Sequence, residues 1–151
     1  MSIDDELAAL RHSELFEGYD RARLKLIAMT GDRVSFRKGE TLLMAGQEPD
    51  CVFVLLSGSV SAGGGANLRV LVGAVGLFLR RPLPVAFVAE TDVEALRLDR
   101  ASFLEILRTC SETSLAVITE LCRVIDLISR HSVREPTASK NLDGYDAAYK
   151  N

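Results

Sequence analysis

The chain has 151 residues, of which 48% are hydrophobic, 6% aromatic and 26% charged, and its formal net charge is −3. A chain of this length can bury a full core as one domain, and its composition excludes disordered and collagen-like proteins. The small negative charge provides no global field that would attract nucleic acid. We therefore expect one domain with an aliphatic core and no DNA-binding surface.

The cysteines and the apolar runs indicate the compartment. Cys51, Cys110 and Cys122 are odd in number and lie in apolar contexts, which predicts reduced thiols serving as small core residues. The N-terminus is acidic and lacks the apolar stretch of a secretory signal. The longest uncharged apolar run, Val70 to Leu79, is too short to span a bilayer. These features predict a cytoplasmic protein with no membrane segment.

The predicted elements change character twice along the chain. Helical spacing predicts helices over residues 4–12 and 19–30, the second with Asp20 available as its cap. Short β-like runs separated by turn residues follow, which is typical of a sandwich or barrel. The predicted strands are Val34–Phe36, Thr41–Met44, Cys51–Leu56, Ser59–Ala62, Leu68–Val72, Ala86–Ala89 and Val93–Leu98.

Helical periodicity returns after Leu98. Asp99 can cap a helix through Leu107, and Ser111 can cap a longer one to about Ser129. The polar end of the chain predicts a disordered tail. The organisation within one domain is therefore a helical segment at 1–32, a β-region at 33–99, C-terminal helices at 100–132 and a tail at 133–151.

Several motifs occur in an order that is similar to one known family. Phe36–Glu40 resembles its strand-to-turn step, Ala45–Asp50 its next turn, and Cys51–Val60 its hairpin. Leu96–Phe103 resembles its strand-to-helix exit. Over about Leu10 to Ile128, the chain resembles the cyclic-nucleotide-binding domain of the catabolite-activator and kinase-regulatory families. The resemblance implies a mainly β fold with flanking helices: a double-stranded β-helix, or jelly-roll-like β-roll.

The segment 72–88 is similar to the family's phosphate-binding cassette, in which a glutamate and an arginine hold the ribose and the cyclic phosphate. Ala74 stands where the glutamate is expected, and Pro84, or Leu83 if the gap moves by one, where the arginine is expected. Val85 replaces the following small residue. The candidate binding residues implied by the resemblance are Gly73, Ala74, Val75, Gly76, Leu77, Arg80, Arg81, Pro84, Val85 and Ala86.

The two replacements weaken the expectation of cAMP or cGMP as ligand. A charge-assisted hydrogen bond is worth roughly 1.5–3 kcal/mol, so losing two lowers affinity by about two to four decades. An alternative is a sensor that binds a cyclic nucleotide or another small anion through the amides near Gly73 and Gly76 with Arg80 or Arg81. In the other interpretation, Arg80 and Arg81 bind no ligand and lie in a solvent-exposed loop that keeps the apolar stretch soluble. The apolar pocket region is either collapsed on its own side chains or open to an apolar ligand.

The long C-terminal helix has two apolar stripes. Leu115, Ile118, Cys122 and Ile125 form one, and Val117, Leu121, Val124 and Ile128 form the other. In the catabolite-activator family the equivalent helix pairs with its twin, so the resemblance implies a homodimer through the helix 113–130. The alternative is a helix buried beneath the N-terminal helices.

Enzymatic and DNA-binding functions lack their residues. The two histidines, His12 and His131, lie at opposite ends of the chain, and no metal-ligand or catalytic pattern is present. No basic recognition helix follows the long helix. The sequence therefore predicts a non-catalytic regulatory or interaction module in signalling, with a homodimer or another protein as partner and with no DNA or membrane.

Overall fold

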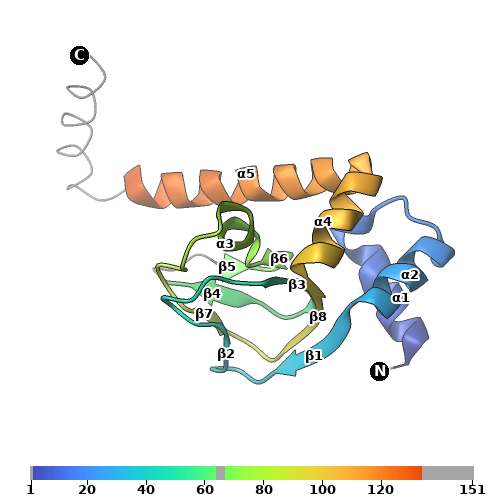
Figure 1. The fold of residues 1–151 in the computed structure, drawn as a ribbon. Helices are drawn as coiled ribbons and strands as arrows, with labels where there is room; N and C mark the ends of the chain where they lie inside the picture. Colours follow the sequence, from blue (N-terminus) through green and yellow to red (C-terminus); the bar gives the residue numbers. More distant parts are fainter. Residues whose placement is uncertain (1, 64–66, 134–151) are drawn as a thin grey trace, which may run out of the picture.

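The computed structural model describes residues 2–63 and 67–133 (Figure 1). The helices are α1 (Ile3–His12), the 3-10 helix η1 (Glu14–Phe16), α2 (Arg21–Thr30), α3 (Ala74–Leu79), α4 (Arg100–Thr109) and α5 (Ser111–Val133). The strands are β1 (Asp32–Phe36), β2 (Thr41–Leu43), β3 (Cys51–Ser57), β4 (Val60–Ala62), β5 (Asn67–Leu68), β6 (Leu71–Val72), β7 (Phe87–Ala89) and β8 (Val93–Asp99).

The strands form two antiparallel four-stranded sheets, in the orders β1-β8-β3-β6 and β2-β7-β4-β5. In the first sheet, β3 pairs with β8 so that Val54 lies opposite Leu96. Figure 1 shows α1, α2 and α4 grouped at one end of the sheets, while α5 runs across them. This arrangement is the β-roll with flanking helices that the sequence predicts.

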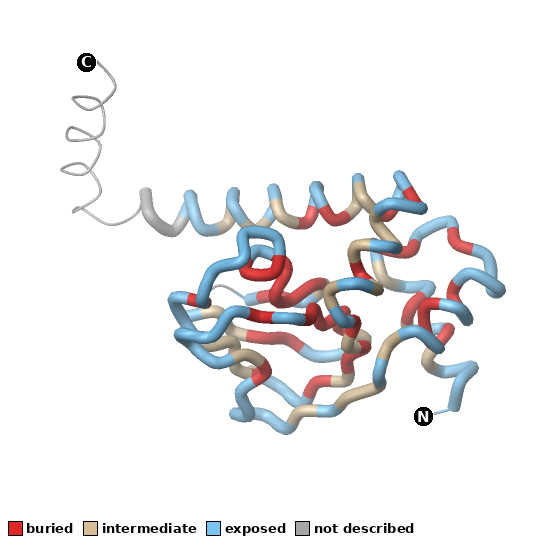
Figure 2. Tube along the Cα trace, viewed as in Figure 1, coloured by how far each residue is buried: buried red, intermediate tan, exposed pale blue. Residues whose placement is uncertain are grey.

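Strand β3 is buried on both faces, which explains its unbroken apolar sequence. Val52 and Val54 point to the helices and join a cluster with residues of α1, α2, α4 and α5. Phe53 and Leu55 point the other way, into the cluster between the two sheets. Successive residues of a strand face opposite sides, so one apolar run serves two cores. Figure 2 shows this burial concentrated in the inner strands and on the inner faces of the helices.

Local signals place the helix starts as predicted. The Asp20 carboxylate accepts a hydrogen bond from the Arg23 amide at 2.8 Å and caps α2. Asp99 does the same for α4 through the Ser102 amide, also at 2.8 Å. That amide bond is the main reason why the pKa of Asp99 is lowered. The cap at Asp20 fixes the start of α2, and the cap at Asp99 fixes the point at which strand β8 is followed by helix α4.

Two predictions about the chain's elements are wrong. The single strand expected over Leu68–Val72 is divided into β5 and β6, which belong to different sheets. The two halves contribute to different cores, because Leu68 is buried in the cluster between the sheets and Leu71 in the helix-side cluster. Helix α5 reaches Val133, past the expected end at Ser129 and into the first residue of the predicted tail. The rest of that tail lies outside the described residues.

The prediction that all three cysteines serve the core holds for two of them. Cys51 and Cys110 are buried free thiols, whereas Cys122 is exposed. On α5 the stripe that contains Cys122 points away from the β-roll, because the adjacent stripe of Val117, Leu121 and Val124 packs inward.

Candidate functional site

Near the start of the cassette, residues 72–88, stands Gly73, a position at which other residues are poorly tolerated. Gly73 has φ 96°, in the left-handed region, and precedes the first residue of α3. A Cβ at this position would lie 2.9 Å from Leu43 Cδ1 and 3.1 Å from the Cys51 carbonyl oxygen. The chain therefore needs glycine both for the turn and for the close approach of α3 to β2 and β3.

Gly76 brings α3 against the opposite wall of the cassette. A Cβ on Gly76 would lie 2.6 Å from Pro49 Cγ and 2.9 Å from Leu83 Cδ2. No pocket of side-chain size separates α3 from these two residues. The second half of the cassette therefore packs directly on the helix.

Leu83 is held inside the cassette by backbone hydrogen bonds. Its N–H donates to the Gln47 carbonyl at 3.0 Å, and its own carbonyl accepts from the Gly46 N–H at 2.8 Å. The side chain is only 6% exposed. The neighbouring residues Pro84 and Val85 are exposed, and Ala86 is half-buried. The interior position next to the helix is thus filled by an aliphatic side chain.

Ala74 occupies the position where the resemblance expects a carboxylate, and it is a core residue. It is 4% exposed and belongs to the same buried cluster as Leu77, which is fully buried. A carboxylate there would be desolvated among aliphatic side chains, so its charged form would be strongly disfavoured. Val75, the next residue, points outward and is 55% exposed.

Arg80 and Arg81 lie at the end of α3 and are both exposed. Arg80 adopts a left-handed conformation, with φ 51°, and closes the helix by donating its N–H to the Gly76 carbonyl. The Arg81 N–H also donates to that carbonyl, at 3.3 Å. The structure thus shows these residues ending the cassette helix, with their side chains at the surface.

Two contacts link α3 to α4, and neither has a recognisable signal in the amino-acid sequence. The Arg100 guanidinium donates a hydrogen bond to the Leu77 carbonyl. The ring of Phe78 lies against that of Phe103, with centroids 5.9 Å apart. The spacing of residues in the sequence cannot predict that Arg100 donates to a carbonyl of α3, because this bond depends on how the two helices pack.

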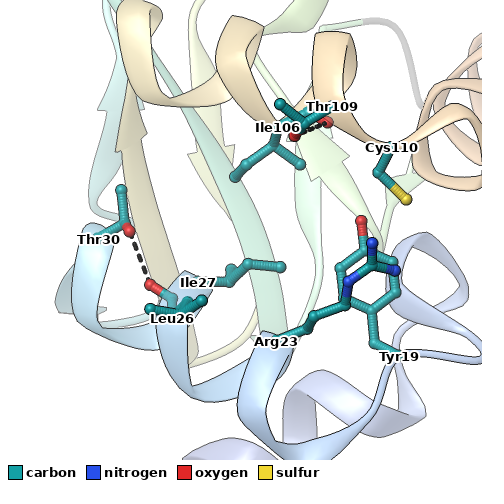
Figure 3. A pocket seen from close by; sticks show the side chains of 8 residues that line it. All are labelled: Tyr19, Arg23, Leu26, Ile27, Thr30, Ile106, Thr109 and Cys110. Atoms are coloured by element: carbon teal, nitrogen blue, oxygen red, sulfur yellow. Dashed lines mark hydrogen bonds between the residues drawn. The ribbon is translucent and has the colours of Figure 1, made fainter.

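A separate cavity of about 210 Å³ lies between α2 and α4, away from the cassette (Figure 3). Arg23 stacks over the ring of Tyr19, its guanidinium carbon 5.3 Å from the centroid. The lining residues are Tyr19, Arg23, Leu26, Ile27, Thr30, Ile106, Thr109 and Cys110. In Figure 3 the Tyr19 hydroxyl and the Cys110 sulfur point toward each other.

The pKa values of Tyr19 and Cys110, two residues that line this cavity, are shifted in opposite directions. Burial is the main reason why the pKa of Tyr19 is raised to about 12. Burial also acts to raise the pKa of the Cys110 thiol, but hydrogen bonds from Thr113 and Tyr19 together outweigh it and lower that pKa to about 7. Cys110 directly precedes α5, whose first amides favour the thiolate. The sequence context of Cys110 predicts only a core residue, because its partners Tyr19 and Thr113 are brought to it by the fold.

Within residues 2–63 and 67–133, no group of three His, Cys, Asp or Glu side chains could hold a metal ion. No helix in that part of the chain is both long enough and apolar enough to cross a membrane.

Comparison with known proteins places the chain in a family. The family model for the cyclic nucleotide-binding domain matches residues 33–110, more than half of the chain. The chain therefore belongs to the cyclic nucleotide-binding domain family. None of the curated proteins compared matches the sequence.

Solved structures share the fold at low sequence identity. The catabolite activator protein of Thermus thermophilus is 23% identical, with a TM-score of 0.62, over 78% of this chain and 60% of that one. PKAR CBD2 with bound Sp-2Cl-cAMPS is 18% identical, with a TM-score of 0.64, over 83% of this chain and 93% of that one. A cAMP-binding acyltransferase from Mycobacterium smegmatis is 23% identical, with a TM-score of 0.56, over 68% of this chain but only 35% of that one. The chain thus spans less than two thirds of two of these proteins, 60% of the catabolite activator protein and 35% of the acyltransferase.

Proposed function

We propose that this domain is a non-catalytic regulatory or interaction module whose cassette does not bind cAMP or cGMP in the family's usual pose. The observation that carries the proposal is the burial of Ala74 and Leu83, two aliphatic side chains, inside the cassette. Neither side chain can form a hydrogen bond to a ribose or pair with a phosphate.

The affinity of this site for a cyclic nucleotide should be low, because the phosphate would lose its hydration without a charged partner in return. A cyclic phosphate that enters this site would give up water without gaining a guanidinium partner from Leu83 or Pro84. With two charge-assisted bonds missing, affinity would fall by about two to four decades relative to a complete cassette. The packing of Leu83 against Gly76 would also have to open.

Calorimetric titration of the full chain with cAMP, cGMP and cyclic dinucleotides, accompanied by thermal unfolding, tests this proposal. A ligand that binds the folded state raises its stability by RT ln(1 + [L]/Kd), so binding must appear in both measurements. We expect no saturable heat and no shift in Tm at about 1 mM ligand. Saturable binding in the micromolar range would contradict the proposal.

Restoring the missing arginine sharpens the experiment. The variant Pro84→Arg returns the family's basic group at an exposed position, and Pro84→Gln is its matched control without charge. We expect cAMP binding to increase only with Pro84→Arg, whereas a carboxylate at the buried position 74 would be desolvated in the core. If the wild type binds and Arg80→Ala/Arg81→Ala removes that binding, the domain is instead an anion sensor using these arginines.

We further propose that the output surface of the module is a homodimer formed through α5. The stripe Leu115, Ile118, Cys122 and Ile125, called here the α5 stripe, is exposed on the side of the helix away from the β-roll. Its spacing of three, four and three residues is that of a two-helix seam. Sedimentation of the wild type and of Ile118→Gln/Ile125→Gln tests this: we expect a dimer that the variant loses, and a monomeric wild type at about 100 µM would contradict it.

A further inference from the structure

The cavity between α2 and α4, called here the α2–α4 cavity, has room for one small organic molecule. Its volume is about 210 Å³, and an adjoining hollow shares Thr30, Ile106 and Thr109 with it. An apolar cavity of about 150 Å³ holds a benzene molecule, so the larger volume suits a ligand of about nine non-hydrogen atoms. That size corresponds to one ring with a single short substituent.

Apolar side chains from both helices form the walls of the α2–α4 cavity. Figure 3 shows Ile27 of α2 and Ile106 of α4 reaching into the space between the two helices. Ile27 is buried, whereas Leu26, which also lines the cavity, is 66% exposed. A ring placed against these side chains would remove apolar surface from water, which is favourable roughly in proportion to the area covered. The walls therefore favour a ligand with an apolar body.

A cation stands among these apolar walls. Of the eight residues that line the α2–α4 cavity, Arg23 is the only one with a positive charge. Its guanidinium carbon lies 5.3 Å from the centroid of the Tyr19 ring, and no ion pair between described residues involves it. A guanidinium that lies over a ring keeps the N–H groups of its edge available, and these match the two oxygens of a carboxylate. Arg23 is therefore placed to bind an anionic group of the ligand.

The other polar groups fix the end of the cavity at which that anionic group lies. The hydroxyls of Thr30 and Thr109 donate to carbonyls of their own helices, at 2.7 and 2.9 Å. With these protons engaged, both hydroxyls can accept hydrogen bonds but cannot donate one to an anion. The adjoining hollow is lined by Glu105, whose negative charge repels a carboxylate. The anionic group is therefore satisfied only at Arg23.

We propose that the α2–α4 cavity binds a small apolar carboxylate, of the size of an aromatic monocarboxylate, with its carboxylate on Arg23 and its apolar body between Ile27 and Ile106. The cavity is a second ligand site of the domain, separate from the cassette. It does not depend on whether the cassette binds a nucleotide or on whether the chain forms a dimer.

The position of the cavity gives such a ligand access to α5. Cys110, which also lines the cavity, is the single residue between α4 and α5. Its N–H donates to the Ile106 carbonyl at 3.0 Å, and its own carbonyl accepts from the Ser114 N–H at 3.2 Å. Cys110 thus closes one helix and opens the next. A ligand in the cavity would contact α2, α4 and this junction together, so its binding would favour one direction of α5 over others.

Calorimetric titration of the full chain with benzoate tests the proposal, and benzamide is the neutral ligand of the same shape. The titration is made at about pH 6, where the Cys110 thiol, with a pKa of about 7, is mostly protonated and does not repel the carboxylate. We expect saturable binding of benzoate with a dissociation constant of about 1 mM. Benzamide should bind at least about tenfold more weakly, because it lacks the charge that pairs with Arg23.

A matched pair of variants locates the carboxylate. Arg23→Gln removes the cation of the cavity, and Lys25→Gln removes the same charge from an exposed residue of α2 that does not line it. We expect the dissociation constant for benzoate to rise at least about tenfold in Arg23→Gln and to stay unchanged in Lys25→Gln.

Alkylation of Cys110 by iodoacetamide, followed by mass spectrometry of its peptide, supplies a second readout. We expect saturating benzoate to slow this reaction, because the bound ring covers the thiol. No saturable binding of benzoate below about 20 mM would overturn the inference. Binding that survives Arg23→Gln, or that benzamide matches, would overturn the assigned ligand class. Binding that leaves the alkylation rate unchanged would place benzoate outside the cavity and would also overturn it.

Discussion

The guanidinium of Arg100 donates a hydrogen bond to the main-chain carbonyl of Leu77, so the first turn of α4 is tied to the cassette helix. The same arginine's N–H donates to the Asp50 carbonyl at 2.9 Å. One residue thus joins α4, the turn before β3 and α3. A displacement of the cassette helix would act directly on α4, and through it on α5.

Replacing Arg100 with glutamine should loosen this connection. A hydrogen bond from a charged donor contributes roughly 1.5–3 kcal/mol, so we expect urea unfolding of Arg100→Gln to show a loss of about that size. Faster hydrogen exchange in α3 should accompany it. Arg108→Gln, near the exposed end of α4, is the control and should change stability by less than about 0.5 kcal/mol. Equal losses in both variants would show that the bond to Leu77 has no special role.

The two reasons for glycine at Gly73 can be separated by a matched pair. Gly39 has φ 91°, close to the 96° of Gly73, but a Cβ on Gly39 would meet no atom within 4 Å. Gly39→Ala should therefore cost only the left-handed conformation, about 1–2 kcal/mol. Gly73→Ala should cost at least about 1 kcal/mol more, because Leu43 and the Cys51 carbonyl obstruct the new methyl group. Equal costs in denaturant unfolding would contradict the close approach of α3.

The lowered pKa of Cys110 predicts a pH-dependent stability. The thiol pKa is about 7 in the folded protein against a reference value of 9.0, so between these pH values the unfolded chain binds more protons than the folded one. The contribution of Cys110 to stability should therefore increase from pH 7 to pH 9 and be lost as the pH falls through about 7. The difference in unfolding free energy between wild type and Cys110→Ser should grow over that window. A difference that is constant with pH would show that the thiolate is not favoured.

Cys122 provides a probe of the dimer's register. It lies between Ile118 and Ile125 in the α5 stripe and is exposed, so in a parallel, in-register pair it would face its twin. We expect a copper–phenanthroline oxidant to convert the wild type to a covalent dimer on non-reducing gels. Cys122→Ser should remain uncrosslinked. Thr119→Cys in that background places a thiol at an exposed position of α5 outside the α5 stripe, and crosslinking there as fast as at Cys122 would contradict the proposed seam.

Much of the fold was predictable because its signals are local. Asp20 and Asp99 marked the starts of α2 and α4, and the turn glycines bounded the strands. The split of residues 67–72 between two sheets was not predictable, since Leu68 and Leu71 differ only in which core they enter. The cassette positions were found by resemblance to the family. The inward packing of Leu83 and the bond from Arg100 were not found, because both depend on backbone carbonyls brought together by tertiary structure.

Because α5 is long, a small change of angle at its junction with α4 would move its far end by a large distance. Its 23 residues make a rod about 35 Å long that begins directly after α4. A rotation of about 10° at that junction would sweep the far end of the rod by about 6 Å, by simple geometry on the helix rise. A small tilt imposed by the cassette helix on α4 would thus arrive at the other end of α5 as a displacement larger than one helical turn. The hydrogen bond from Arg100 to the Leu77 carbonyl is the point at which such a tilt would enter α4.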